Sequence, residues 1–174
     1  MPTVSVFCGL SLDGFLARAD GTFDFLDEGG SVPHGYTEFM ATVDTLLIGR
    51  NTWEVVAAFP EWPYEKKRVV VLSSSPIDFS TARGAVEQLA GRPAEIVAKL
   101  AASGAKHIYL DGGITIQRFL RDGLVDRLTI SQVPVLIGRG IPLFGSLPHD
   151  VKLKHVATKS YPTGLVKSEY EVLR

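Results

Sequence analysis

The sequence predicts a mixed α/β fold: a sheet that is mostly parallel, an antiparallel hairpin at its C-terminal side, and helices on both faces of the sheet. Three observations lead to this prediction. The first part of the chain contains short apolar runs without polar alternation, which are typical of strands covered on both faces. Segments with helical spacing of apolar residues separate these runs. After residue 123 the pattern changes to strand-like segments alone.

Four short apolar runs are the candidate strands of the parallel part. They are rich in β-branched and aliphatic residues, as buried strands usually are. They cover residues 3–8 (TVSVFC), 44–48 (DTLLI), 68–72 (RVVVL) and 107–110 (HIYL).

The segments between these runs carry apolar residues at the spacing of one helix face. Tyr36, Phe39, Met40 and Val43 recur at i, i+3, i+4 and i+7, a pattern that predicts an amphipathic helix. The same spacing predicts helices around residues 53–57, 96–101 and 116–120. The predicted order in this part is therefore strand, helix, strand, helix.

The last third of the chain is predicted to contain strands only. Residues 125–137, 151–160 and 165–173 are strand-like, and the last two segments are separated by the turn sequence YPTG. These two segments predict the terminal antiparallel hairpin.

Length and charge limit the classes of function. The 174 residues can bury one sizeable core, and no shift in composition divides the chain, so a single domain over 1–174 is expected. The 18 Lys and Arg and 19 Asp and Glu give a net charge of −1, which leaves no broad cationic face. Neither a nucleic acid nor a membrane is therefore an expected partner.

Cysteine and histidine usage disfavours disulfides and metals. Cys8 is the single cysteine, and the four histidines lack the spacing of a metal site, so no metal site is expected. The N-terminus lacks the basic start and long apolar centre of a signal peptide, and a cytoplasmic location is expected.

Three predicted strand ends carry residues that suit phosphate groups. Ligands of open α/β sheets bind at the carboxyl ends of strands. Gly112 and Gly113 stand between a strand and a helix, where backbone N–H groups and the helix dipole favour an anion. Arg50 follows another strand end, and Ser73 and Ser74 follow a third. Together they suggest a ligand with several phosphates, such as a dinucleotide, although each alone is also consistent with an ordinary turn or surface residue.

The usual dinucleotide signature is missing, because GRG at residues 138–140 continues into IPL and opens no helix. Other motifs point to a family. The segment GRNTWE (49–54) resembles the corresponding segment of dihydrofolate reductases, and VLSS (71–74) resembles their next cofactor-binding strand end. The segments SLDG (11–14), YLDGG (109–113), FL (119–120), GLVDRL (123–128) and PVLIGRG (134–140) resemble those of the RibD C-terminal, or pyrimidine reductase, family. The matches cover nearly the whole chain in the correct order.

This resemblance implies a dihydrofolate reductase-like fold with NADPH lying across the strand ends. It places Arg50 at the adenosine 2′-phosphate and Ser73 and Ser74 near the adenosine. The nicotinamide would border Leu16 and Ala17, which are expected in the loop after the first strand. The pyrophosphate would be held beside Gly49 by Thr52 and the backbone of Gly112, Gly113, Ile114 and Thr115, with assistance from Gln117.

The candidate catalytic residues are Asp13 and Asp111. Asp111 stands where the family has a glutamate, and it is one methylene shorter. Asp111 is equally consistent with a residue that caps the following helix. Asp13 is equally consistent with an ordinary turn residue.

The implied activity is NADPH-dependent hydride transfer to a small heterocyclic substrate, with 5-amino-6-(5-phosphoribosylamino)uracil of riboflavin biosynthesis as a candidate. Reduction of dihydrofolate or another pteridine, and NADPH binding without turnover, are the alternatives. A homodimer formed through the C-terminal strands is also expected.

Overall fold

The computed structural model describes residues 1–64 and 66–174. Its main sheet has eight strands in the order β5-β4-β3-β6-β1-β7-β10-β9, and a second sheet pairs β2 with β8. The strands are β1 Thr3–Ser11, β2 Phe15–Ala17, β3 Thr45–Gly49, β4 Arg68–Leu72, β5 Val86–Leu89, β6 His107–Asp111, β7 Arg127–Val133, β8 Ile141–Pro142, β9 Leu153–Ser160 and β10 Val166–Val172.

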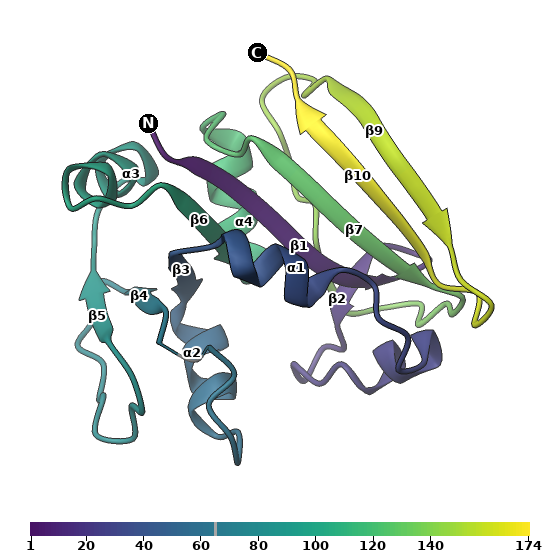
Figure 1. Cartoon of the computed structure of the whole chain (residues 1–174), viewed down its shortest axis with the longest axis horizontal. Helices are drawn as coiled ribbons and strands as arrows, with labels where there is room; N and C mark the ends of the chain where they lie inside the picture. Colours follow the sequence, from purple (N-terminus) through teal and green to yellow (C-terminus); the bar gives the residue numbers. More distant parts are fainter. Residues whose placement is uncertain (65) are drawn as a thin grey trace.

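Helices connect the strands of the first two thirds of the chain (Figure 1). They are α1 Tyr36–Thr42, α2 Arg50–Ala57, α3 Pro93–Ala102, α4 Gly113–Arg121 and the short 3₁₀ helix η1 Asp24–Gly29.

The sheet is parallel from β5 to β7 and antiparallel where β10 pairs with β7 and β9. Figure 1 shows β10 and β9 as a long terminal hairpin at one side of the molecule. The predicted mixed sheet with its C-terminal hairpin is therefore confirmed.

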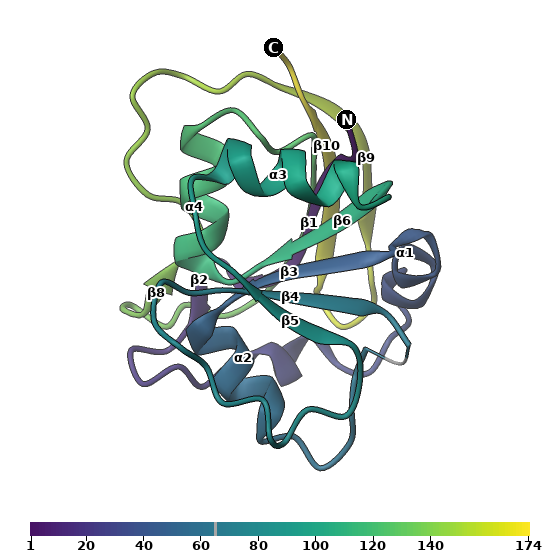
Figure 2. The ribbon, with the colours of Figure 1, turned by 90° about the vertical axis from the view of Figure 1, so that its left-hand side faces the viewer.

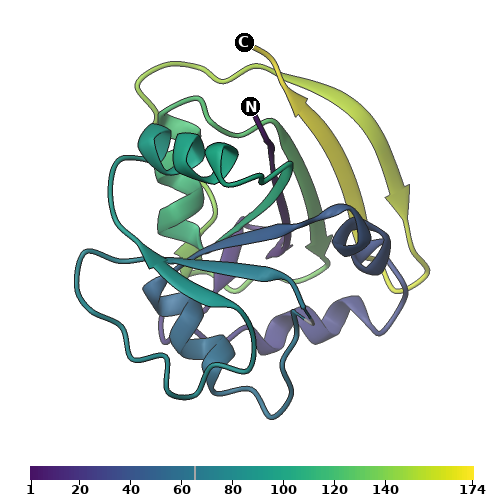
Figure 3. The ribbon, with the colours of Figure 1, turned by 60° about the vertical axis from the view of Figure 1, so that its left-hand side comes forward.

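Helices cover both faces of the sheet because the strand side chains alternate in direction. Val4 and Val6 of β1 pack in one apolar cluster with α3 and α4. Phe7 of the same strand packs in a second cluster, with α1 and α2. Figure 2 and Figure 3 show α3 and α4 together on one side of the sheet and α1 on the other.

Short elements escaped the sequence prediction. β5 carries only the segment VEQL, which shows little hydrophobic patterning, and β8 has two residues. Leu16 and Ala17, expected in a loop, belong to the three-residue strand β2. β7 ends at Val133, so only part of the strand-like segment 125–137 is a strand.

None of the helices in the described part of the chain is long and apolar enough to cross a bilayer.

Candidate functional site

A cavity of about 630 Å³ opens where the parallel strands end. The residues at the ends of β3 and β6, the starts of α2 and α4, and the middle of β1 contribute to its wall. This is the edge at which open α/β sheets bind ligands. The lining residues fall into two groups, one polar and rich in glycine and one aromatic.

The glycine-rich half is formed by two helix N-termini that face each other. α2 begins at Arg50 after Gly49, and α4 begins at Gly113 after Gly112, and neither helix has a side-chain cap. The first N–H groups of both helices are therefore open to an anion, which the two helix dipoles also favour.

Side chains are excluded from this meeting point by close contacts. A Cβ atom on Gly112 would stand 2.7 Å from Thr52 Oγ1, and one on Gly49 would stand 2.7 Å from Thr115 Oγ1. Gly112 also has a φ of +98°, which side chains rarely tolerate. Glycines at both positions thus keep a narrow polar cradle between the two threonines.

Arg50 lies at one end of this cradle, with its guanidinium fixed against the segment after β4. Its Nη2 donates to Ser73 Oγ at 2.9 Å and to the carbonyl oxygens of Ser75 and Pro76 at 2.7 and 2.8 Å. Its Nη1 makes only a long contact of 3.9 Å, to Glu54. This arginine is held in place while part of its fork remains available to a ligand.

Gln88 of β5 holds the same segment from behind. Its Nε2 donates to the carbonyl oxygens of Ser73 and Ser75, both at 2.9 Å, and its Oε1 accepts from the N–H of Ile77 at 3.1 Å. One side chain therefore fixes three backbone groups in the loop that orients Arg50.

The aromatic half of the cavity is walled by rings that pack against one another. Phe7 and Tyr36 meet edge to face at 5.5 Å between centroids, and Tyr36 and Tyr109 at 6.4 Å. His34 lies 5.7 Å from Phe7. The Tyr109 hydroxyl donates to the carbonyl oxygen of Phe7 at 2.8 Å, which locks β6 to β1 at this point.

Asp111 stands between the two halves, at the end of β6. Its Oδ1 accepts the N–H of Gly112 at 2.8 Å. Burial raises the pKa of Asp111 above its ordinary value, and this hydrogen bond opposes the rise only in part. Burial and the nearby Asp111 charge also raise the pKa of Tyr36 to about 12, and they raise the pKa of the Cys8 thiol above its ordinary value. The site thus holds a carboxyl group that retains its proton more readily than an exposed one.

Leu16 and Ala17 border the cavity from β2, beside the start of α4. Leu16 Cδ1 lies 3.2 Å from the place that a Cβ on Gly113 would take, and Ile141 of β8 lies at a similar distance. The small β2–β8 sheet therefore closes the cavity over the glycine-rich half.

The structure brings ten of the predicted site residues to the cavity wall: Leu16, Ala17, Gly49, Arg50, Thr52, Asp111, Gly112, Gly113, Ile114 and Thr115.

Four predicted residues do not line the cavity. Ser73 orients Arg50, and Ser74 is exposed. Gln117 donates to the carbonyl oxygen of Pro142 at 3.0 Å, so it supports β8. Asp13 Oδ2 accepts the N–H of Gly138 at 2.7 Å, which ties two loops together.

Sequence reasoning missed the aromatic half as a unit. Phe7 and Tyr109 lie inside strands, where a single sequence cannot separate a core ring from a cavity wall. His34 and Tyr36 reach the cavity only because α1 packs beside β1 and β6. Arg118 of α4, also missed, lines the wall one helical turn after Ile114. The i, i+4 spacing of these two residues was the only available signal.

Among the described residues, no group of three or more His, Cys, Asp or Glu side chains is placed to hold a metal ion.

Comparisons with known proteins agree with this architecture. A family model described as the RibD C-terminal domain matches residues 2–167. The uncharacterized protein YwjB of Bacillus subtilis is 33% identical over 159 residues, which are 90% of each chain.

Solved structures show the same fold. A protein of Shewanella sp. PV-4, whose name provisionally assigns it to riboflavin biosynthesis, is 34% identical, with a TM-score of 0.90 over 99% of each chain. Dihydrofolate reductase from Enterococcus faecalis, solved with NADP(H), is 17% identical, with a TM-score of 0.66 over 99% of this chain and 97% of that one, and so shares the fold. The chain belongs to the RibD C-terminal domain family.

Proposed function

We propose that this protein is an NADPH-dependent reductase that transfers a hydride to a small heterocyclic substrate. The observation that carries the proposal is the cradle between the N-termini of α2 and α4. Two uncapped helix starts converge there, and a Cβ on Gly49 or Gly112 would fill the space between them. A pyrophosphate is the ligand group that such a cradle fits best.

The residues around the cradle fit the remaining parts of NADPH. Thr52 and the backbone from Gly112 to Thr115 would hold the pyrophosphate. Arg50 would bind the adenosine 2′-phosphate with the part of its guanidinium that Ser73 leaves free. Leu16 and Ala17 would border the nicotinamide. A fixed guanidinium favours NADPH over NADH, since NADH lacks the 2′-phosphate.

NADPH supplies the hydride when it is bound, and the protein must orient the acceptor and provide a proton. Asp111 stands between the two halves of the cavity, and burial raises the pKa of its carboxyl group above the ordinary value, so we assign it the role of proton donor. Asp13 accepts a hydrogen bond from the loop at Gly138, so we assign it the structural role of holding that loop.

The family assignment supports a pyrimidine-like acceptor and a place in riboflavin biosynthesis. The compound 5-amino-6-(5-phosphoribosylamino)uracil is the first acceptor to test. A pteridine is the second candidate, because the cavity holds a half-buried carboxylate, Asp111, that can accept hydrogen bonds from ring N–H groups.

Titration of NADPH and NADH into the purified protein tests the proposal. We expect Arg50→Ala to raise the Kd for NADPH about 10- to 100-fold, because the variant loses a charge-assisted hydrogen bond to the 2′-phosphate. The Kd for NADH should change less than about threefold, since NADH has no 2′-phosphate. Arg139→Ala is the matched control, because this exposed arginine lies outside the cavity wall. No binding of either nucleotide by the wild type would overturn the proposal.

A further inference from the structure

The order of the strands separates positive charge from aromatic rings along the cavity. Four neighbouring strands lie in the order β4, β3, β6, β1. Arg50 follows β3 and is bonded to the segment after β4, Asp111 ends β6, and Phe7 lies in β1. Neighbouring strands are about 4.8 Å apart, so the backbone of Arg50 starts roughly 10 Å from β1. The fixed guanidinium points farther away still.

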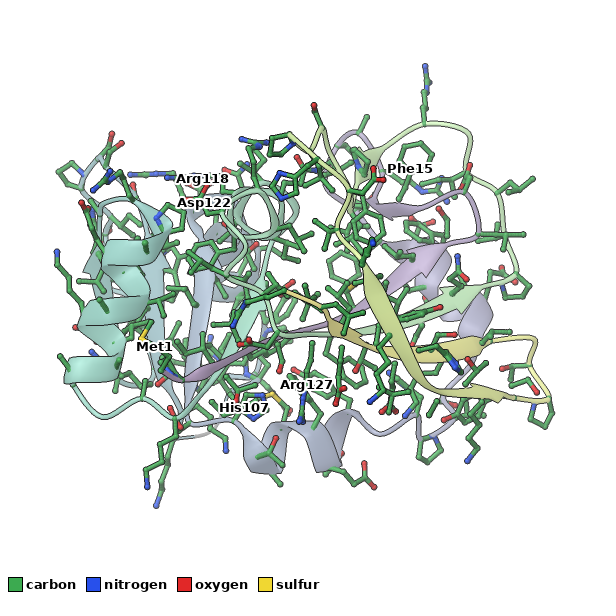
Figure 4. The ribbon with its side chains drawn as sticks, turned by 90° about the horizontal axis from the view of Figure 1, so that it is seen from above. Met1, Phe15, His107, Arg118, Asp122 and Arg127 are labelled. Atoms are coloured by element: carbon green, nitrogen blue, oxygen red, sulfur yellow. The ribbon has the colours of Figure 1, made fainter. Side chains whose placement is uncertain are left out.

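Arg118, the second arginine of the cavity wall, also belongs to the other half. It lies on α4, whose apolar side packs in the cluster on the sheet face opposite Phe7 and Tyr109. Figure 4 shows Arg118 on the far side of the sheet from α1. Neither guanidinium of the described cavity wall therefore faces the aromatic rings.

The rings themselves form a prearranged apolar surface. Phe39 stacks on Phe7 at 5.0 Å and meets Tyr109 edge to face at 5.0 Å, so α1 fixes both rings from behind. Phe7 and Tyr109 are each about one-twentieth exposed. Phe23, which is 43% exposed, lines the same cavity from the segment before η1. A flat ligand would meet the small exposed parts of these packed rings and the open side chain of Phe23.

The described wall of this half offers no lysine or arginine, and His34 is its one imidazole. Asp111, the carboxylate of the described cavity wall, borders this half, and the ring faces carry partial negative charge. Lys167 of β10 lies behind the segment of His34, with its Nζ 3.1 Å from the place of a Cβ on Gly35. This lysine pairs with Glu169 at 2.9 Å and is outside the cavity wall.

We infer that the aromatic half takes a flat heterocycle without a phosphate group. A phosphate bound there would face the Asp111 carboxylate and the ring faces, because both arginines of the cavity wall lie in the opposite half. Two like charges close together in a site shielded from water repel each other strongly. This inference rests on the proposed function, since it leaves the glycine-rich half to NADPH. It makes the phosphoribosyl compound a poorer ligand than its dephosphorylated form.

A pair of ligands that differ only in the phosphate tests the inference. We would titrate 5-amino-6-(ribosylamino)uracil and its 5′-phosphate into NADPH-saturated protein by calorimetry. The unphosphorylated compound is expected to bind at least about tenfold more tightly. Asp111→Asn should narrow this ratio by improving binding of the phosphate form, because it removes the opposing charge and keeps the shape. Lys167→Met should leave the ratio unchanged.

Tighter or equal binding of the phosphate form would overturn the inference. If the Lys167→Met variant then lost that binding, Lys167 would be identified as the residue that binds the phosphate. Failure of both compounds to bind would also contradict it. NADPH binding is measured first and separately. If NADPH does not bind, the proposed function fails, and the same ratio measured on the free protein still decides the inference.

Discussion

Two glycines of this chain share nearly the same φ but differ in their surroundings. Gly112 has a φ of +98° and Gly104 a φ of +95°. A Cβ on Gly112 would stand 2.7 Å from Thr52 Oγ1, whereas nothing lies within 4 Å of one on Gly104. Substitution by alanine at either position adds comparable backbone strain, about 1–3 kcal/mol. Only the change at Gly112 enters the cradle.

We therefore expect Gly112→Ala to raise the Kd for NADPH about 10- to 100-fold, while Gly104→Ala leaves it unchanged. Fluorescence titration of both variants, with thermal unfolding as a check on folding, makes the comparison. Equal binding by the two variants would show that the cradle does not hold the nucleotide.

Asp111 and Asp13 should change stability with pH in opposite directions. Burial raises the pKa of Asp111, so the native state keeps a proton that the unfolded chain loses as the pH rises above 3.8. The native state then loses stability with rising pH, and Asp111→Asn should become more stable relative to wild type between about pH 4 and pH 8. Chemical denaturation at both pH values measures the difference.

Asp13 supplies the control of opposite sign. The hydrogen bond from Ser11 holds the pKa of Asp13 below its ordinary value, so its stabilising contribution is present above pH 3.8 and is lost as the pH falls below it. Asp13→Asn should be less stable than wild type at neutral pH, and the difference should shrink in acid. If the stability difference from wild type changed with pH in the same direction for both variants, the assignment of Asp111 as a buried acid would be contradicted.

At the scale of elements, the loop after β4 depends on a strand that carries no cavity residue. Gln88 of β5 bonds three backbone groups of residues 73–77, and Arg50 bonds the same loop from the other side. Gln88→Leu removes these bonds and should loosen the acceptors that aim Arg50. We expect the Kd for NADPH to rise about three- to tenfold, with no change for NADH.

Gln132→Leu, a change of the same type on β7 and outside the cavity wall, is the control for Gln88. Titration of both nucleotides into both variants distinguishes orientation of Arg50 from a general loss of structure. A parallel loss of NADPH and NADH binding would contradict the role of Gln88.

The sequence was sufficient to predict the bounds of strands that are covered on both faces. β4 carries RVVVL and lies between two parallel strands, so its pattern predicted its bounds directly. β5 is an edge strand with the segment VEQL, and edge pairing leaves little hydrophobic signal. The glycine-rich half of the site was predictable because strand ends and glycines are visible in sequence. The aromatic half was not, since it requires knowing that β1 lies beside β6 and under α1.

At the scale of the whole molecule, β9 leaves a long edge of the sheet open. All eight of its residues are exposed, and β5 at the other edge has only four. Exposed lysines usually discourage strand pairing at a sheet edge, but the two lysines of β9 interact within their own chain. Lys154 pairs with Glu171 at 3.3 Å, and Lys159 lies over the Tyr161 ring. Such an edge favours pairing with a second copy, and we propose a homodimer formed there.

Analytical ultracentrifugation tests the dimer. Wild type should sediment at twice the chain mass of 18.9 kDa, and Val156→Lys on β9 should shift it toward the monomer. Leu136→Lys, at another exposed apolar residue in the loop after β7, should remain dimeric. A monomeric wild type at micromolar concentration would contradict the proposal.

A crystal structure of the protein with NADP⁺ tests the central claim most directly. The account predicts the pyrophosphate between Thr52 and Thr115, the 2′-phosphate on the guanidinium of Arg50, and the nicotinamide beside Leu16, facing Asp111 and the aromatic half. A nucleotide bound outside this cavity, or one with its nicotinamide at the Arg50 end, would contradict the account.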